Sequence, residues 1–298
     1  MTAATYAAAQ LLRVLPRTHI TRAVGRLCDA RLPTALSTAV VGLYARAYDV
    51  ALEDTVDPVG AWGSFDAFFT RALRDGARPI DVDADAVVSP SDGRIEAIGP
   101  VDRGGRFRIK GRDYTVAELV GDAAEADRYD GGQFVVVYLS PRDYHRVHAP
   151  VGGAVTVVRS MPGDLYPVNS IGERHIPSLF ARNRRVAIVI DPVDGSARGR
   201  VTVVMVGAMI VGRITVTGVA GRDVPVGDHP IAPPRSVARG DEIGVFHLGS
   251  TAVVFVEKGA SPAFTAPLGT IRMGQALAAG ATASRPGHAR ASGGGSTP

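Results

Sequence analysis

The chain is poor in lysine and cysteine. Its 298 residues contain two lysines, Lys110 and Lys258, and one cysteine, Cys28. A single cysteine excludes an intrachain disulfide, which is compatible with a reducing cytoplasm. Enzymes that use pyridoxal phosphate hold it on a lysine. Neither lysine lies in an evident phosphate-binding loop, so the sequence does not indicate that cofactor.

The sequence also shows neither a transmembrane helix nor a secretory signal peptide. Hydrophobic residues make up 46% of the sequence, yet no stretch approaches the ~20 uninterrupted apolar residues of a transmembrane helix. Residues 1–10 lack the charged leader of a secretory signal. We therefore expect neither a membrane-spanning helix nor export.

The net charge of +4 resides in the N-terminal segment. Residues 1–48 hold six arginines and one acid, Asp29, whereas the remaining residues hold 27 basic and 28 acidic side chains. Apolar residues in this segment recur at helical spacing, with a proline before each set: Ile20, Val24 and Leu27 after Pro16, and Leu36, Val40, Leu43 and Ala47 after Pro33. Amphipathic helices that carry arginine suit an anionic membrane surface. The alternative is a helical bundle packed on the rest of the protein. No aromatic-rich basic motif indicates nucleic acid.

The apolar period changes from helical to strand-like near residue 85. Short β-branched runs separated by Gly, Pro and Asp turns predict strands at 133–139, 185–190, 201–206, 209–217 and 252–256. Thr115 and Glu118 have the spacing of a capping box at the start of a short helix. We predict an α+β protein: a helical, basic, membrane-associating region of residues 1–75, then a compact, mainly antiparallel β-domain of residues 76–278 that carries the active site. Residues 279–298, rich in Ala, Gly, Ser and Pro, are predicted to be disordered.

One Gly-Ser bond has the sequence context of a self-reacting site. Leu248-Gly249-Ser250-Thr251 lies between the turn-rich segment 239–244 and the strand-like run 252–256. Glycine has no Cβ to obstruct attack of the serine hydroxyl on the carbonyl before it. The same tetrapeptide is also what a simple turn before a strand contains.

A serine nucleophile needs a base, usually a histidine oriented by a carboxylate. His145 and His148 lie together in residues 138–150, and Asp92 follows Ser91 in a tight-turn sequence. A helical turn begun at Ser140-Pro141 would bring both histidines to one side, whereas a strand would point them to opposite faces. Structural histidines and a turn aspartate are the alternative. A zinc site is less attractive because no third ligand cluster accompanies the pair.

Several segments together resemble one family. In chain order they are Phe68–Arg71, Ser89–Gly93, Tyr144–Pro150, Met161–Asn169, Leu179–Asn183, Val206–Gly212 and Leu248–Thr251. Over roughly residues 65 to 277 the chain resembles bacterial, pyruvoyl-dependent phosphatidylserine decarboxylases. The resemblance departs at Pro167, where the family often has a serine.

The resemblance implies a complete chemistry. His148, oriented by Asp92, would deprotonate Ser250, which attacks Gly249 and cuts the chain there. Ser250 would become a covalent pyruvoyl group, so that neither a metal nor pyridoxal phosphate is needed. The enzyme would convert phosphatidylserine to phosphatidylethanolamine and CO2, with His145 acting on the substrate. It would consist of its two cleavage chains, with further dimerisation open, and would lie at the cytoplasmic face of the cell membrane as a peripheral protein.

The substrate contacts are expected from position. Phe68, Phe69 and Arg71 offer an apolar and cationic surface for an acyl chain and a phosphate, although a helix packing face explains them equally well. Thr251 and nearby backbone N–H groups are expected oxyanion donors. For the phosphate, Arg142 and Arg146 are further candidates.

Two other function classes compete with this interpretation. A serine hydrolase acting on a lipid ester would keep Ser250 intact, but the Gly-x-Ser-x-Gly elbow typical of such enzymes is absent around Ser250. A non-enzymatic lipid-binding domain would have neither cleavage nor a reactive carbonyl group.

Overall fold

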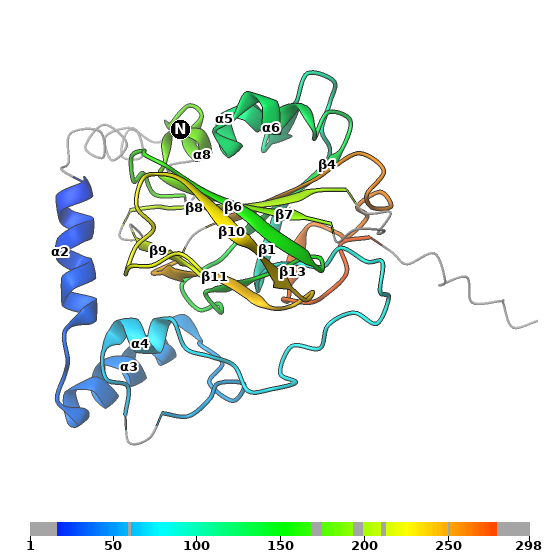
Figure 1. The fold of residues 1–298 in the computed structure, drawn as a ribbon. Coiled ribbons are helices and arrows are strands. Elements are labelled where there is room, and N and C mark those ends of the chain that lie inside the picture. The colour runs from blue at the N-terminus through cyan, green and yellow to red at the C-terminus, as the bar shows by residue number, and fades with distance from the viewer. Residues whose placement is uncertain are drawn as a thin grey trace, which may run out of the picture.

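The computed structural model describes residues 17–58, 61–168, 175–192, 199–209, 213–249 and 251–278. Ser250 and the predicted disordered tail of residues 279–298 lie outside these ranges. The described part begins with three helices, continues through a β-domain and ends at residue 278 (Figure 1).

The helices fall into two groups. Three lie in the N-terminal region: α2 (Arg17–Asp29), α3 (Thr34–Tyr48) and α4 (Phe65–Phe69). In the described part of the β-domain there are three short ones: α5 (Val116–Val120), α6 (Ala123–Asp127) and α8 (Leu179–Arg182). The predicted helical character of the N-terminal region is confirmed, and α3 begins directly after Pro33. The predicted capping box is also present, because the Glu118 backbone N–H donates to Thr115 and the Glu118 carboxylate accepts from the Thr115 N–H.

The described residues of the β-domain form three antiparallel sheets. Its strands are β1 (Gly93–Pro100), β2 (Arg106–Ile109), β3 (Arg112–Thr115), β4 (Gln133–Tyr138), β5 (Arg146–His148), β6 (Gly153–Met161), β7 (Arg185–Asp191), β8 (Val201–Val206), β9 (Arg213–Val216), β10 (Gly227–Val237), β11 (Glu242–His247), β12 (Thr251–Val256) and β13 (Gly269–Ile271). The large sheet has the order β10-β6-β7-β8-β12-β4-β1-β13, and the small sheets are β5-β11-β9 and β2-β3. In Figure 1, α5 and α6 cover one side of the large sheet and β9 and β11 lie on the other. The predicted α+β class is confirmed.

The strand predictions agree with the structure where strands are continuously apolar. The runs at 133–139, 185–190, 201–206 and 252–256 correspond to β4, β7, β8 and β12. The run at 209–217 is shorter than predicted in the described part, since β9 begins at Arg213 and residues 210–212 lie outside it. The turn-rich segment 239–244 already contains the start of β11 at Glu242.

Strand β12 lies in the interior of the large sheet. All six of its residues are buried, and it pairs with β4 on one side and β8 on the other. Thr251, its first residue, lies opposite Tyr138 and Val206. Consequently the Gly249-Ser250 bond immediately precedes a rigid central strand.

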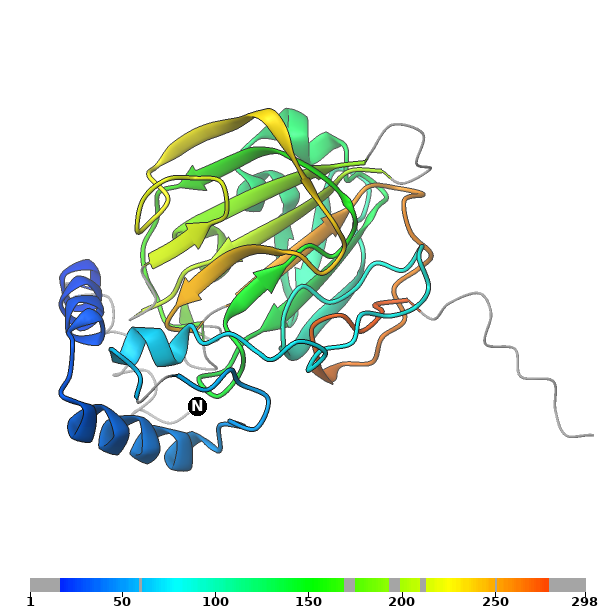
Figure 2. The same ribbon diagram turned by 60° about the horizontal axis from the view of Figure 1, so that its bottom comes forward.

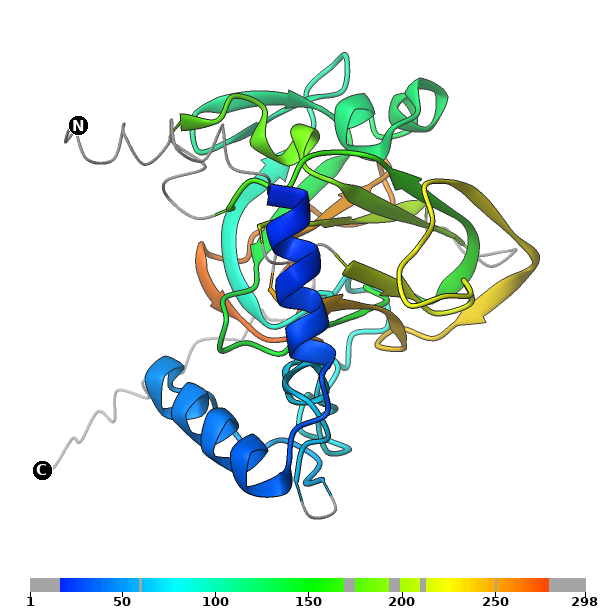
Figure 3. The same ribbon diagram turned by 90° about the vertical axis from the view of Figure 1, so that its left-hand side faces the viewer.

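The N-terminal helices lie along one side of the β-domain (Figures 2 and 3). Helix α4 contacts both α2 and α3. Helix α3 buries Ser37 and Val41, whereas the predicted apolar positions Leu27 and Leu43 are 72% and 69% exposed. These two leucines therefore face outward, whereas Val24, in the same stripe as Leu27, is partly buried against the core. Within the described residues, no helix has the length and apolarity to span a membrane.

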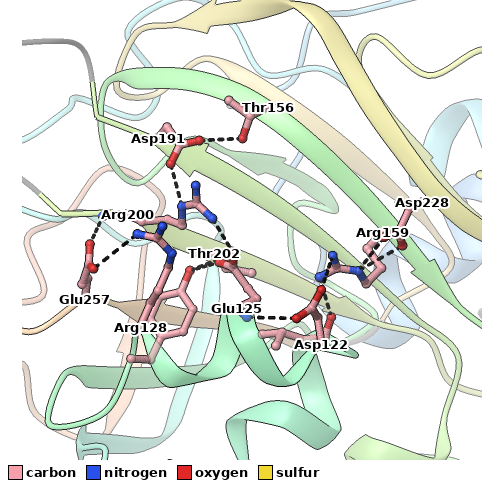
Figure 4. A network of polar contacts seen from close by, with 12 residues as sticks. Asp122, Glu125, Arg128, Thr156, Arg159, Asp191, Arg200, Thr202, Asp228 and Glu257 are labelled. Atoms are coloured by element: carbon pink, nitrogen blue, oxygen red, sulfur yellow. Dashed lines mark hydrogen bonds and ion pairs between the residues drawn. The ribbon is translucent and has the colours of Figure 1, made fainter.

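A polar network fixes α6 to the far end of the large sheet (Figure 4). Glu125 is buried and accepts hydrogen bonds from Tyr129 at 2.7 Å and from Arg200 at 2.6 Å, and Arg200 also binds Asp191. Arg200 directly precedes β8 at the end opposite Val206, so the network and Thr251 lie at opposite ends of β12. At ~3.4 Å per strand residue, the six residues of β12 separate the two by roughly 20 Å. The network therefore serves the fold and not the reaction centre.

Candidate active site

The predicted scissile turn connects β11 to β12 in an unfavourable backbone conformation. Leu248 has φ 80° and Gly249 has φ 25°, both in the left-handed region. A side chain with a Cβ is disfavoured there by about 1–2 kcal/mol, so Leu248 stores backbone strain beside the bond that is predicted to break. A Cβ at Gly249 would lie 3.1 Å from His145 Nε2, so a side chain there would require the imidazole to shift.

His145 is fully buried against this turn. Its ring packs on Phe69 with centroids 4.0 Å apart. Neither ring nitrogen makes a hydrogen bond of good geometry among the described residues. Burial, reinforced by the positive charge of Arg71, lowers the pKa of His145 from 6.5 to about 3, and the nearby Asp143 backbone opposes this only weakly. His145 is therefore neutral at physiological pH, with an unpartnered Nε2 next to Gly249.

His148 is hydrogen-bonded through both ring nitrogens. Its Nδ1 lies 2.8 Å from the Gly240 carbonyl oxygen, and its Nε2 lies 3.0 Å from the Tyr144 hydroxyl. A carbonyl only accepts, so the proton resides on Nδ1, and Nε2 accepts from Tyr144. Burial lowers the pKa of His148, while the Gly240 hydrogen bond and the charge of Glu242 act in the opposite direction. The ring is a neutral base with its lone pair on Nε2.

Strand pairing brings His145 close to the scissile turn and places His148 opposite Glu242, at the other end of β11. β5 pairs with β11, and the Phe246 N–H donates to the His145 carbonyl. Ser140-Pro141 gives a turn closed by Asp143 rather than a helix, with the Ser140 N–H 2.6 Å from the Asp143 carboxylate. Of the two geometries left open by the sequence, the structure has the extended one.

Asp92 directly precedes β1 and lies beside the His148 segment. The His148 N–H donates to the carbonyl of Pro90, two residues before Asp92. The Asp92 carboxylate binds Arg78 through both Nε and Nη2 at 2.7–2.9 Å and accepts the Met273 N–H at 2.9 Å. Among the described residues, the partner of His148 Nδ1 is the Gly240 carbonyl. Asp92 acts on His148 through its charge, which raises the pKa of that ring.

Two further predicted site residues are buried with unsatisfied polar atoms. Thr251 is buried, and its hydroxyl has no hydrogen-bond partner among the described residues. The same holds for Nε and Nη1 of Arg71, whereas its Nη2 donates to the carbonyls of Arg142 and Asp143. Of the two tentative phosphate contacts Arg142 and Arg146, Arg146 is paired with Glu242 at 2.8 Å.

An apolar cavity of about 330 Å³ opens beside Gly249. Its walls come from both regions of the chain, with Val24, Cys28 and Tyr44 from α2 and α3 on one side and Tyr138 and Leu248 on the other. Phe69 also lines it, whereas Phe68 packs beneath against Tyr44 and Trp62 and does not reach its wall, and neither does Arg71. Cavities of 300–1,000 Å³ are typical of small-molecule sites. Its lining is mainly apolar and reaches Leu248 and Gly249 of the scissile turn.

A charged cluster holds the N-terminal helices to the strand that leads into this turn. His247 Nδ1 lies 2.9 Å from the Asp66 carboxylate of α4, and Arg213 of β9 binds Asp66 at 2.7 Å. Arg213 also binds Asp29 of α2 at 2.6 Å. These contacts fix α2 and α4 relative to Leu248 and so maintain the cavity wall.

Sequence reasoning missed several residues of the site. Tyr144 and Gly240 orient His148, and Arg78 holds Asp92, yet none was singled out. Tyr144 carried a signal, because it stands beside the two histidines in the matched segment 144–150. A backbone carbonyl such as that of Gly240 carries none.

No metal centre is visible in the described ranges, since no group of three or more His, Cys, Asp or Glu side chains there could hold an ion. The covalent group predicted from Ser250 does fit its surroundings. The adjoining Gly249 has an unpartnered imidazole against it, and the neighbouring Thr251 hydroxyl is buried and unsatisfied.

Comparison with known proteins adds independent information. The family model described as phosphatidylserine decarboxylase matches residues 65–279. A protein of Shewanella baltica named phosphatidylserine decarboxylase proenzyme is 38% identical over 278 residues, which cover 89% of this chain and 94% of the relative. One of the same name from Psychrobacter arcticus is 40% identical over 276 residues, covering 90% and 96%.

Proposed function

Because the chain belongs to the phosphatidylserine decarboxylase family, we propose that it cuts itself at Gly249-Ser250 and then removes CO2 from phosphatidylserine, leaving phosphatidylethanolamine. The observation that carries this proposal is the contact between Gly249 and the unpartnered Nε2 of a buried, neutral His145, at the wall of an apolar cavity. The name proenzyme, borne by the relatives, agrees with self-processing.

Self-cleavage uses the groups around the strained turn. His148 Nε2 takes the Ser250 hydroxyl proton, and the oxygen attacks the Gly249 carbonyl carbon. The C–N bond then breaks, and the nitrogen of Ser250 takes the proton from His148, which leaves an ester. Loss of the Ser250 α-proton expels the Gly249 carboxylate, and one water then replaces the nitrogen as ammonia, leaving a pyruvoyl group. The Thr251 hydroxyl, buried without a partner, is a donor for the oxyanion.

In turnover the pyruvoyl carbonyl supplies the sink for the electrons of the breaking C–C bond. The chain's own residues provide the environment. The apolar walls exclude water from the lipid headgroup, which disfavours the charged carboxylate relative to neutral CO2. His145 has an unpartnered nitrogen beside Gly249, so we assign it a proton transfer in two steps: it takes a proton from the substrate ammonium group and returns it to the substrate carbon when CO2 leaves.

Intact mass of the purified protein tests the proposal directly. We expect two chains from the wild type, ending at Gly249 and beginning at position 250, with the second lighter by one ammonia than a serine-led peptide. Ser250→Ala should remain a single chain, because it has no hydroxyl to attack Gly249.

The competing functions give different masses. A serine hydrolase or a non-enzymatic lipid-binding protein would remain one chain in the wild type and would not react with a hydrazine reagent. A folded, uncut wild-type protein would therefore refute self-cleavage.

We further propose that the N-terminal helices attach the protein peripherally to an anionic membrane at the cytoplasmic face. Leu27 of α2 and Leu43 of α3 are largely exposed although they belong to the apolar stripes of their helices. Both helices wall the apolar cavity through other residues, such as Val24 and Tyr44. Insertion of these helices would therefore bring the cavity to the bilayer that contains the substrate.

The double variant Leu27→Ser/Leu43→Ser tests membrane attachment. Burial of one leucine is worth about 1.5–3 kcal/mol, so we expect binding to phosphatidylglycerol-containing vesicles to weaken at least tenfold in a sedimentation assay. The matched control is Val82→Ser/Leu268→Ser, which replaces two exposed apolar residues outside the N-terminal helices, 99% and 64% exposed. Equal losses in both double variants would contradict attachment through α2 and α3.

A further inference from the structure

A second cavity, of about 510 Å³, lies against the apolar one. Both contain Cys28 and Leu248 in their walls, so the two cavities adjoin at these residues. The second cavity is lined by α2 on one side and by β-domain residues on the other. Its walls, unlike those of the first, are strongly charged.

Helix α2 turns its polar face into this cavity. Thr18, Thr21, Arg22, Gly25, Arg26 and Asp29 line it, and they recur at the three- and four-residue spacing of one helix face. Val24, by contrast, lines the apolar cavity, and Leu27 is exposed. Two of the arginines that we assigned to a membrane surface from the sequence, Arg22 and Arg26, therefore also line this cavity.

The charges around this cavity do not cancel. Four arginines and three aspartates line it, which leaves one positive charge. Arg184 binds Asp223 at 2.6 Å, and Arg213 binds Asp29 and Asp66. Arg22 and Arg26 have no ion pair or side-chain hydrogen bond with another described residue and are exposed. The uncompensated positive charge is therefore on α2, where Arg22 and Arg26 lie one helical turn apart.

From these observations we propose that Arg22 and Arg26 bind the phosphodiester of the lipid substrate. This inference rests on the proposed function. In phosphatidylserine an oxygen and one CH2 group separate the phosphorus from the carbon that carries the amine. A headgroup reacting beside Gly249 must keep its phosphate within a short distance of Leu248, where the two cavities meet. Guanidinium groups match phosphate oxygens in geometry as well as charge. The site thus selects a serine phospholipid over a serine lipid without phosphate.

The test uses dihexanoyl phosphatidylserine below its micelle concentration, so that no membrane is present. For Arg22→Gln/Arg26→Gln we expect KM to rise about tenfold or more with kcat little changed, since charged hydrogen bonds contribute about 1.5–3 kcal/mol. Inhibition by glycerophosphoserine should weaken by the same factor. Arg22→Lys/Arg26→Lys, which keeps both charges, should recover part of the affinity. Arg31→Gln/Arg46→Gln removes the same charge from exposed positions outside the cavity and should behave as the wild type.

The outcomes separate this inference from the proposed function. An uncut wild type refutes the proposed function itself. If the wild type is cut and active but KM is unchanged in Arg22→Gln/Arg26→Gln, only the phosphate site is overturned. If that variant loses vesicle binding while its KM is unchanged, the two arginines act at the membrane surface. Equal inhibition by inorganic phosphate and glycerophosphoserine, insensitive to these substitutions, also contradicts the inference. If Arg22→Gln/Arg26→Gln is not cut, its KM cannot be measured, and Arg22→Lys/Arg26→Lys is used in its place. If the lysine variant is also not cut, Arg22 and Arg26 are needed for folding and the phosphate site is overturned.

Discussion

Replacing His148 with glutamine is expected to slow self-cleavage by ~10²–10⁴-fold, the usual contribution of a general base. The ring is buried and neutral, and the Gly240 carbonyl fixes its proton on Nδ1, so Nε2 is the basic atom. Glutamine can still donate to Gly240 and accept from Tyr144, but it cannot take the Ser250 proton. The measurement is the fraction of cut chain over time, read by intact mass.

The control for His148 is His229→Gln. His229 lies in β10, and its Nε2 bonds the Pro225 carbonyl outside the site. We expect this variant to be cut at the wild-type rate. Cleavage of His148→Gln at the wild-type rate would remove His148 as the base.

Replacing His145 with glutamine is expected to leave cleavage intact and to lower turnover by ~10²–10⁴-fold. His145 contacts Gly249 through an unpartnered nitrogen, so its loss removes a proton donor without removing the base for Ser250. The rate of CO2 release is measured on protein already shown to be fully cut. If His145→Gln were as uncut as Ser250→Ala, the assignment of separate roles to the two histidines would be wrong.

The same variant has a second expected signature, in the pH dependence of stability. The pKa of His145 is about 3 in the folded protein against about 6.5 in an unfolded chain. Between these values the unfolded state binds more protons than the folded state. The contribution of His145 to the free energy of unfolding therefore falls as the pH falls below 6.5. His145→Gln should therefore lose less stability than the wild type between pH 7 and pH 5, by up to about 1.36 kcal/mol per pH unit. The lowered pKa of His148 affects the pH dependence of stability equally in both proteins. The difference between the two pH profiles therefore reports on His145 alone. Urea unfolding measures it, and identical pH profiles would contradict the depressed pKa.

The sequence predicted the elements whose patterns are strong. The N-terminal helices carry a helical apolar period between prolines, and the central strands β4, β7, β8 and β12 are continuous β-branched runs. β10 was missed because its sequence contains three prolines, which sheets tolerate at an edge, and β10 is an edge strand. Which face of each N-terminal helix is covered could not be predicted either, since it depends on where α4 and the β-domain lie.

The sequence also singled out His145, which lies beside Gly249, but it did not show how the predicted site residues are connected. Asp92, His145 and Gly249 come from three distant segments, and only the pairing of β5 with β11 brings His145 to Gly249. The orientation of His148 by Asp92 stays a prediction, because the Asp92 carboxylate accepts from Arg78 and Met273 in this structure and His148 Nδ1 binds the Gly240 carbonyl. The order of residues along the chain does not show which group each side chain will hydrogen-bond in the folded protein.

The position of β12 between β4 and β8 has a consequence for the lifetime of the enzyme. If Ser250 is processed as proposed, the small chain contributes an interior strand of a sheet whose other described strands, except β13, belong to the large chain. The first folding, before the cut, brings that strand in as part of one molecule. Every later refolding requires two molecules to meet, so recovery from denaturation depends on protein concentration. Self-cleavage would thus remove the peptide bond that connected β12 to the large chain when the sheet first assembled.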